Sequence, residues 1–119
     1  MNRHRSLTAW TRSHDLAVAI HRAARLLPRE ERFELGSQLR RAATSVTANI
    51  AEGFARRGAR EFSHFLSMAL GSLAEIDALL ALIRELGYLE PATLDGIDPL
   101  RDSASAAVFA LMRRMRGTG

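Results

Sequence analysis

Residues 35–56 constrain the fold most strongly, because their apolar and polar side chains repeat at the spacing of an α-helix. At roughly 100° per residue, one narrow arc holds apolar and small side chains: Leu35, Leu39, Ala42, Val46, Ile50 and Gly53. A second arc beside it holds short polar groups and charges of both signs: Gln38, Arg41, Ser45, Asn49, Glu52 and Arg56. We therefore predict a helix with a core face and an adjoining polar arc.

The polar arc is open to three interpretations: a partly buried seam, an ordinary solvated flank, or a ligand or catalytic site. Short polar groups and opposite charges suit a seam, because polar atoms inside a protein need hydrogen-bond partners. We favour the seam and expect it to continue on the next helix. The carboxylates of Glu52 on this helix and Glu75 on the next would accept hydrogen bonds from arginine, serine or asparagine side chains within or between subunits. The predicted seam comprises Gln38, Arg41, Ser45, Asn49, Glu52, Ser72 and Glu75.

Helical repeats also occur before and after this segment. The first helix is predicted over residues 8–27 and ends at Pro28, because a proline displaces the preceding residue from the helical region. The second helix is predicted over 31–56, following a charged connector that can form one helical turn. The third is predicted over 59–86, where Gly87 supplies the left-handed position that often ends a helix.

The fourth helical segment is predicted over residues 91–115 and begins as a short turn at Pro91. Its regular helix is expected to start with Asp98 as N-cap and Pro99 as first helical residue. Four helices with short connections, in a single domain spanning 1–119, predict an all-α, antiparallel, up-down-up-down four-helix bundle. The apolar face of the third helix is too broad for one neighbour, which favours burial against another subunit as well.

Composition narrows the classes of function. The chain has no cysteine, which excludes disulfides and thiolate metal sites and fits a cytoplasmic location. The N-terminus is polar and arginine-rich, so we expect no signal peptide. The apolar stretch 62–86 contains Glu75 and Asp77 and is not expected to span a membrane. The chain has 17 arginines and no lysine. This preference suits phosphate binding but equally reflects the codon usage of a GC-rich genome.

Several short motifs resemble those of a known family. They are the run Gln38-Leu39-Arg40-Arg41-Ala42, the run Asn49-Ile50-Ala51-Glu52-Gly53, and Gly71-Ser72-Leu73 followed by Glu75. Together they resemble the four-helix-bundle family of 23S ribosomal RNA intervening-sequence proteins, over roughly residues 7–115. The resemblance implies an antiparallel four-helix bundle that forms a homopentameric ring. It also implies kinship with the accessory protein of diversity-generating retroelements, a basic pentameric barrel thought to bind nucleic acid. The family of intervening-sequence proteins has no established catalytic residues, so the resemblance assigns none to this chain.

The predicted topology separates the charges along the bundle. The N-terminus, the connection near residue 58 and the C-terminus share one end, which carries nine arginines and three acidic residues, or a net charge of +6. The opposite end carries five arginines and eight acidic residues, or −3, and the residues between the ends complete the total of +4. The predicted nucleic-acid-binding residues are Arg3, Arg5, Arg12, Arg56, Arg57, Arg60, Arg113, Arg114 and Arg116.

These arginines have two interpretations. A ring of parallel subunits would repeat them around its rim and attract phosphate backbones. Alternatively, those at helix C-termini complement the helix dipole, worth about 0.3–1 kcal/mol each. The second interpretation does not explain Arg12 or Arg60, which lie near helix N-termini. Aromatic side chains do not alternate with the arginines along the sequence, and only Trp10 is a stacking candidate, so we expect largely sequence-independent binding.

The sequence contains no recognisable catalytic or metal-binding pattern. A di-iron bundle needs a Glu-x-x-His pair on each of two helices, and this sequence has a single one, Glu61 with His64. His14 and His21 share a helix face without a third ligand. We therefore predict no enzyme activity, metal or cofactor. Gly53 and Gly71 are expected to permit close helix packing. Our preferred function is an oligomeric protein that binds RNA or DNA; the alternative is a protein–protein adaptor whose basic end docks an acidic partner.

Overall fold

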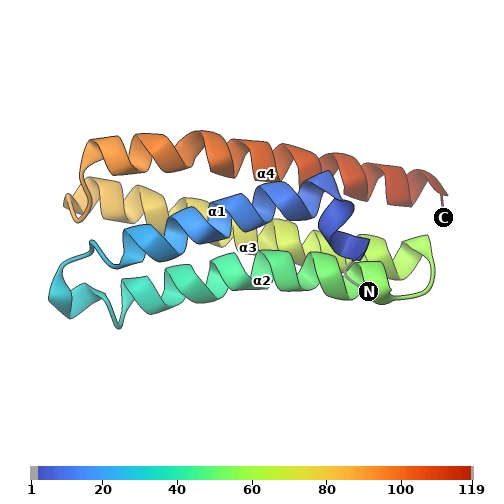
Figure 1. Cartoon of the computed structure of the whole chain (residues 1–119), viewed down its shortest axis with the longest axis horizontal. Helices are drawn as coiled ribbons and strands as arrows, with labels where there is room; N and C mark the ends of the chain where they lie inside the picture. Colours follow the sequence, from blue (N-terminus) through green and yellow to red (C-terminus); the bar gives the residue numbers. More distant parts are fainter. Residues whose placement is uncertain (1–2, 119) are drawn as a thin grey trace.

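The computed structural model describes residues 3–118, in which every regular element is a helix. A short 3-10 turn, η1 (Arg3–Ser6), precedes α1 (Thr8–Ala24), and a second, η2 (Arg29–Glu31), precedes α2 (Leu35–Ala55). Then follow α3 (Ala59–Leu86) and α4 (Pro91–Thr118). The four long helices lie side by side and antiparallel in a rod of 45 × 22 × 20 Å (Figure 1). The predicted four-helix bundle is therefore confirmed.

Each helix packs on its neighbours in sequence, and α1 also packs on α4, which closes the bundle. The core face predicted for α2 is buried throughout, with Leu39, Val46 and Ile50 completely shielded from solvent. At Gly53, the last core-face position, an added Cβ would lie 2.6 Å from Cβ of Phe65. Glycine is therefore needed for the close approach of α2 and α3, as expected. Gly71 has no such role within the chain, because an added Cβ would meet nothing within 4 Å.

The connections between helices follow the backbone preferences of their residues. Gly87 ends α3 in the left-handed conformation (φ 70°) and donates its N–H to the carbonyl of Arg84. Gly58 separates α2 from α3 at φ 90°, a region that residues with a Cβ rarely adopt. Before α2, the charged connector forms η2, and Arg32 donates from Nε to the carbonyl of Leu27 at 3.0 Å. This separate turn explains why α2 begins at Leu35 rather than at residue 31.

The prediction for the start of the last helix was wrong. α4 is continuous from Pro91 and includes Pro99 in its interior, although an interior proline costs about 3 kcal/mol. The preceding turns are held by Leu94 and Ile97, which are almost fully buried, and burial of such side chains is worth about 1.5–3 kcal/mol each. Asp98 does not cap a helix; its carboxylate instead binds two arginine side chains.

α3 is the helix within residues 3–118 that is long and apolar enough to cross a membrane, judged by length and composition alone. Part of its hydropathy belongs to the core face, where Leu66 and Ile76 are fully buried. The rest lies on the outer face, where Met68, Leu82 and Leu86 are about half exposed. The broad apolar face predicted for this helix therefore extends beyond the core of the single chain.

Candidate nucleic-acid interface

The fold brings the predicted phosphate-binding arginines to one end of the bundle. The start of α1, the connection between α2 and α3, and the end of α4 lie together at this end, on the side of the two marked termini in Figure 1. We call this surface the basic end. All nine of its arginines are exposed: Arg3, Arg5, Arg12, Arg56, Arg57, Arg60, Arg113, Arg114 and Arg116. Because they come from three segments, their proximity depends on the fold and not on one sequence run.

Aromatic side chains support several of these arginines, which the sequence analysis did not foresee. The guanidinium of Arg56 lies 5.1 Å from the ring centroid of Phe65. That of Arg113 lies 5.9 Å from the ring of Phe109, one helical turn earlier. These distances suit cation–π attraction, which holds a guanidinium in place while leaving its edge exposed. The four-residue spacing of Phe109 and Arg113 was visible in the sequence, whereas the Arg56–Phe65 contact required the turn at Gly58.

Glu52 neutralises little of the charge at this end. Glu52 pairs with Arg56 at 2.8 Å, but both side chains are about half exposed, so the pair is weak. Arg60 and Arg116, from α3 and α4, line one surface hollow of about 300 Å³ together with Ser63. Two guanidinium groups line this hollow and no carboxylate of residues 3–118 does, which forms a local environment that favours an anion.

The structure brings together part of the predicted polar seam. Ser45 on α2 and Ser72 on α3 share a hydrogen bond of 2.9 Å between their hydroxyls. Asn49 donates from Nδ2 to both the hydroxyl and the backbone carbonyl of Ser45. These three side chains are half-buried and link the two helices, as a seam should, and Gln38 is also half-buried. The remaining predicted members, Arg41, Glu52 and Glu75, are exposed.

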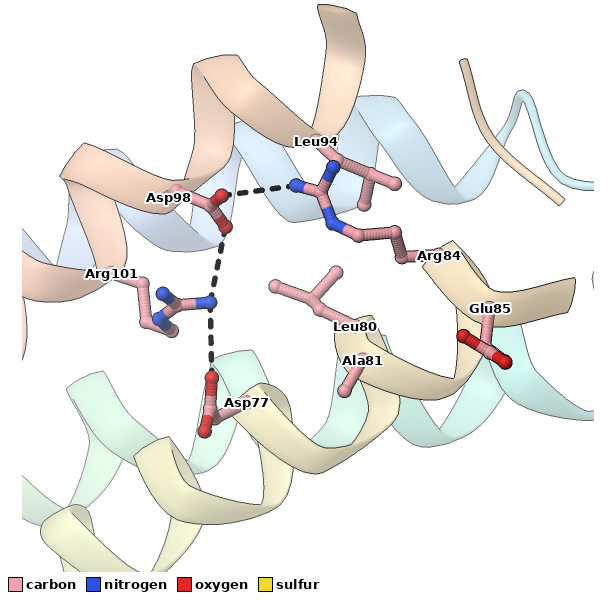
Figure 2. A pocket seen from close by; sticks show the side chains of 8 residues that line it. All are labelled: Asp77, Leu80, Ala81, Arg84, Glu85, Leu94, Asp98 and Arg101. Carbon is pink, nitrogen blue, oxygen red and sulfur yellow. Dashed lines mark hydrogen bonds and ion pairs between the residues drawn. The ribbon is translucent and has the colours of Figure 1, made fainter. Parts of the chain in front are cut away.

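A larger polar network lies between α3 and α4, where sequence reasoning predicted nothing (Figure 2). Arg101, whose side chain is only 19% exposed, binds Asp77 and Asp98 at 3.1 Å and Asp102 at 3.3 Å. Arg84 extends the network by binding Asp98 and Asp95. The hollow that these side chains line has more carboxylates than arginines, and each guanidinium there is already paired. The network therefore joins two helices and does not suit phosphate binding.

The histidines of α1 are held by neighbouring groups. The ring of His14 stacks on Trp10 with centroids 4.7 Å apart, and Nδ1 of His21 lies 2.9 Å from the carbonyl oxygen of Ala17. Among residues 3–118, no group of three or more histidine, aspartate or glutamate side chains is arranged to hold a metal ion.

Comparison with known proteins adds independent information. A family model described as 23S rRNA-intervening sequence protein matches residues 5–108. Among solved structures, the chain is similar to a protein of unknown function from the S23 ribosomal protein family of Bacteroides thetaiotaomicron VPI-5482, determined at 1.70 Å resolution. The two share 23% sequence identity and a TM-score of 0.81, over 88% of this chain and 95% of that chain.

A search of curated proteins found no match. At 23% identity, the structural similarity shows the shared fold alone. The family match, in contrast, extends over most of the sequence, including the motifs of α2 and α3. On this basis, the chain belongs to the family of 23S rRNA-intervening sequence proteins.

Proposed function

We propose that this protein is a non-enzymatic, oligomeric nucleic-acid-binding protein that contacts the phosphate backbone of RNA or DNA through its basic end. The observation that carries the proposal is the convergence of nine exposed arginines from three segments on one end. Arginine forms bidentate hydrogen bonds with phosphate oxygens, and backbone contacts of this kind need no particular base sequence.

The pattern of contacts at the basic end supports binding over simple helix capping. Cations at helix C-termini complement the dipole, but Arg60 lies in the first turn of α3, where the dipole repels it. It lines the same hollow as Arg116, so two like charges lie close together, and no carboxylate from the described part of the chain lines that hollow. A bound phosphate would offset this repulsion, which plain solvation only screens.

Self-association is part of the proposal because the outer face of α3 is apolar enough to pack on another copy. Met68 and Leu82 are each 45% exposed on this face, and Gly71 and Ala78 between them leave room for close approach. The exposed Glu75 lies between them as well, so this face carries one carboxylate among its apolar side chains. Copies arranged in parallel would carry their basic ends on one side of the assembly. Linked sites bind a long polyanion far more tightly than single sites, because later contacts become intramolecular.

The test combines light scattering with filter binding of a structured RNA and a duplex DNA over a range of salt concentrations. The variant Arg57→Ser/Arg60→Ser removes two charges from the basic end. The control Arg29→Ser/Ala92→Glu changes the net charge by the same amount at the opposite end. For duplex DNA, a plot of log association constant against log salt concentration has a negative slope, to which each phosphate contact contributes about 0.9 in magnitude. The slope should therefore be less steep by about 1.8 in the first variant, which loses two contacts.

Three outcomes would contradict the proposal. If neither nucleic acid binds in a salt-dependent manner, the basic end does not bind phosphate backbones, and docking of an acidic protein becomes the better explanation of the same arginines. If the variant and its control weaken binding equally, the effect comes from net charge and not from the basic end. A monomer in light scattering would exclude the oligomer.

A further inference from the structure

A second arginine-lined surface lies along α1 and α2, outside the basic end. It consists of two adjoining hollows of about 520 and 500 Å³ that share His21, and we call them the α1–α2 groove. No acidic side chain lines either hollow. The groove carries six basic side chains: His14, His21, Arg22, Arg25, Arg40 and Arg41. The hollows between α3 and α4 differ, because carboxylates line them and pair with their arginines.

The arginines of the groove are not neutralised by the protein. Within residues 3–118, Arg22, Arg25 and Arg41 form no ion pair, and all three are exposed. Arg40 donates to the backbone carbonyl of Arg32 at 3.3 Å, a contact that leaves its charge in place. Arg22 and Arg25 lie three residues apart on one helix, where like charges repel each other. An anion in the groove would offset this repulsion.

His21 occupies the junction of the two hollows. Its Nδ1 lies 2.9 Å from the carbonyl oxygen of Ala17, and a carbonyl only accepts, so this nitrogen carries the proton and donates. The ring is therefore fixed in one orientation between the arginines of α1 and those of α2.

The groove continues into the basic end. His14, at one end of the groove, stacks on Trp10, and the guanidinium of Arg5 lies 5.9 Å from the Trp10 ring. Arg5 belongs to the basic end. From Trp10 to Arg25 the helix rises about 22 Å at about 1.5 Å per residue, which corresponds to roughly six base-pair steps of about 3.4 Å along a duplex axis. An extended polyanion can follow this path, whereas a single phosphate reaches only part of it.

We propose that the α1–α2 groove is a second phosphodiester-binding surface, which holds the same nucleic acid as it leaves the basic end. This inference rests on the proposed function and deepens it by giving the strand a path along the side of the bundle. It also assigns binding roles to Arg22, Arg25 and Arg41, which lie away from the basic end.

Exposed alanines provide a matched test. Ala48→Glu places a carboxylate in the groove, and Ala106→Glu places one on the exposed face of α4, with the same change in net charge. The parent, both variants and the double variant Arg22→Ser/Arg41→Ser are compared by filter binding of structured RNA and duplex DNA over a salt series, after circular dichroism has confirmed helix content. Ala48→Glu should weaken binding about tenfold and Ala106→Glu less than twofold. In the double variant, the salt dependence of duplex DNA binding should be less steep by about 1.8 in log association constant per log salt concentration, because two phosphate contacts are lost.

The outcomes separate this inference from the proposed function. If Ala48→Glu and Ala106→Glu bind alike while Arg57→Ser/Arg60→Ser binds weakly, the groove is overturned and the basic end stands. If the parent shows no salt-dependent binding, both proposals fall. Inorganic phosphate, added at the phosphate concentration of the RNA, should not displace the RNA; displacement would identify a small-anion site and overturn the assignment to a strand.

Discussion

Substitution of Gly53 by alanine tests the closest contact between α2 and α3. An alanine Cβ there would lie 2.6 Å from Cβ of Phe65 and 3.0 Å from Cδ1 of Phe62. A Cβ cannot move by changing rotamer, so the two helices must separate or the Phe65 backbone must shift. Gly71 on α3 is the matched control for packing within one chain, because a Cβ there meets nothing within 4 Å. Gly71 also lies on the face proposed for self-association, so its effect on assembly has to be measured separately.

The magnitude follows from two opposing terms. Replacing a helical glycine by alanine raises the free energy of unfolding by up to about 1 kcal/mol through its higher helix propensity. Gly53 lies in the last turn of α2, so this stabilisation is no larger there than at Gly71. Overpacking of a close contact costs about 1–3 kcal/mol. Gly71→Ala should therefore raise the free energy of unfolding by up to about 1 kcal/mol. Gly53→Ala should be less stable than Gly71→Ala by about 1–3 kcal/mol.

Urea unfolding followed by circular dichroism measures both variants, with the protein concentration varied to separate folding from assembly. The difference between their unfolding midpoints should appear without a change in m, since neither variant alters the surface exposed on unfolding. If Gly53→Ala proves as stable as Gly71→Ala, the α2–α3 contact is looser than the structure indicates, and the steric reasoning is wrong.

Three other experiments test the polar contacts. Ser13→Ala should raise the free energy of unfolding by about 1 kcal/mol in a urea titration, because it removes a buried hydroxyl with no hydrogen-bond partner in the described chain; a loss of stability would point to a partner from outside it. In the same titration, Ser45→Ala should lower the free energy of unfolding by about 1–2 kcal/mol and Ser72→Ala by about 0.5–1 kcal/mol, because the Ser45 hydroxyl has two side-chain partners. Equal losses in the two variants would contradict this reasoning. Arg101→Gln should lower Tm more in dilute buffer than in about 1 M salt, which screens its ion pairs with aspartates; a salt-independent loss would indicate lost packing instead.

The fold was largely predictable because apolar spacing and turn residues acted locally. The core face of α2 and the left-handed Gly87 were both readable from the sequence. The interior position of Pro99 was not, because its local preference for a first helical turn is outweighed by burial of Leu94 and Ile97 against other helices. Gly71 contacts no other helix of the described chain, and the sequence did not show this because a small residue in a helix does not reveal which surface it faces.

The candidate site was predictable only in part. Topology alone placed the arginines of the basic end, since it fixes which helix termini lie together. Arg22 and Arg25 lie on α1 and Arg41 on α2, so no local sequence pattern groups these three arginines of the α1–α2 groove. Likewise, the network around Arg101 joins residues from two helices at spacings that no local pattern marks. Contacts of this kind depend on how the helices rotate against each other.

The order of helix contacts also shapes how the chain acquires its structure. Three of the four main interfaces join consecutive helices, whereas α1 and α4 come from opposite ends of the sequence. Chains rich in such local contacts fold in microseconds to milliseconds, and closing a long loop costs entropy before its contacts form. We therefore expect helical hairpins to form early and α1 to dock on α4 late. Substitutions between α1 and α4 should then speed unfolding more than they slow folding.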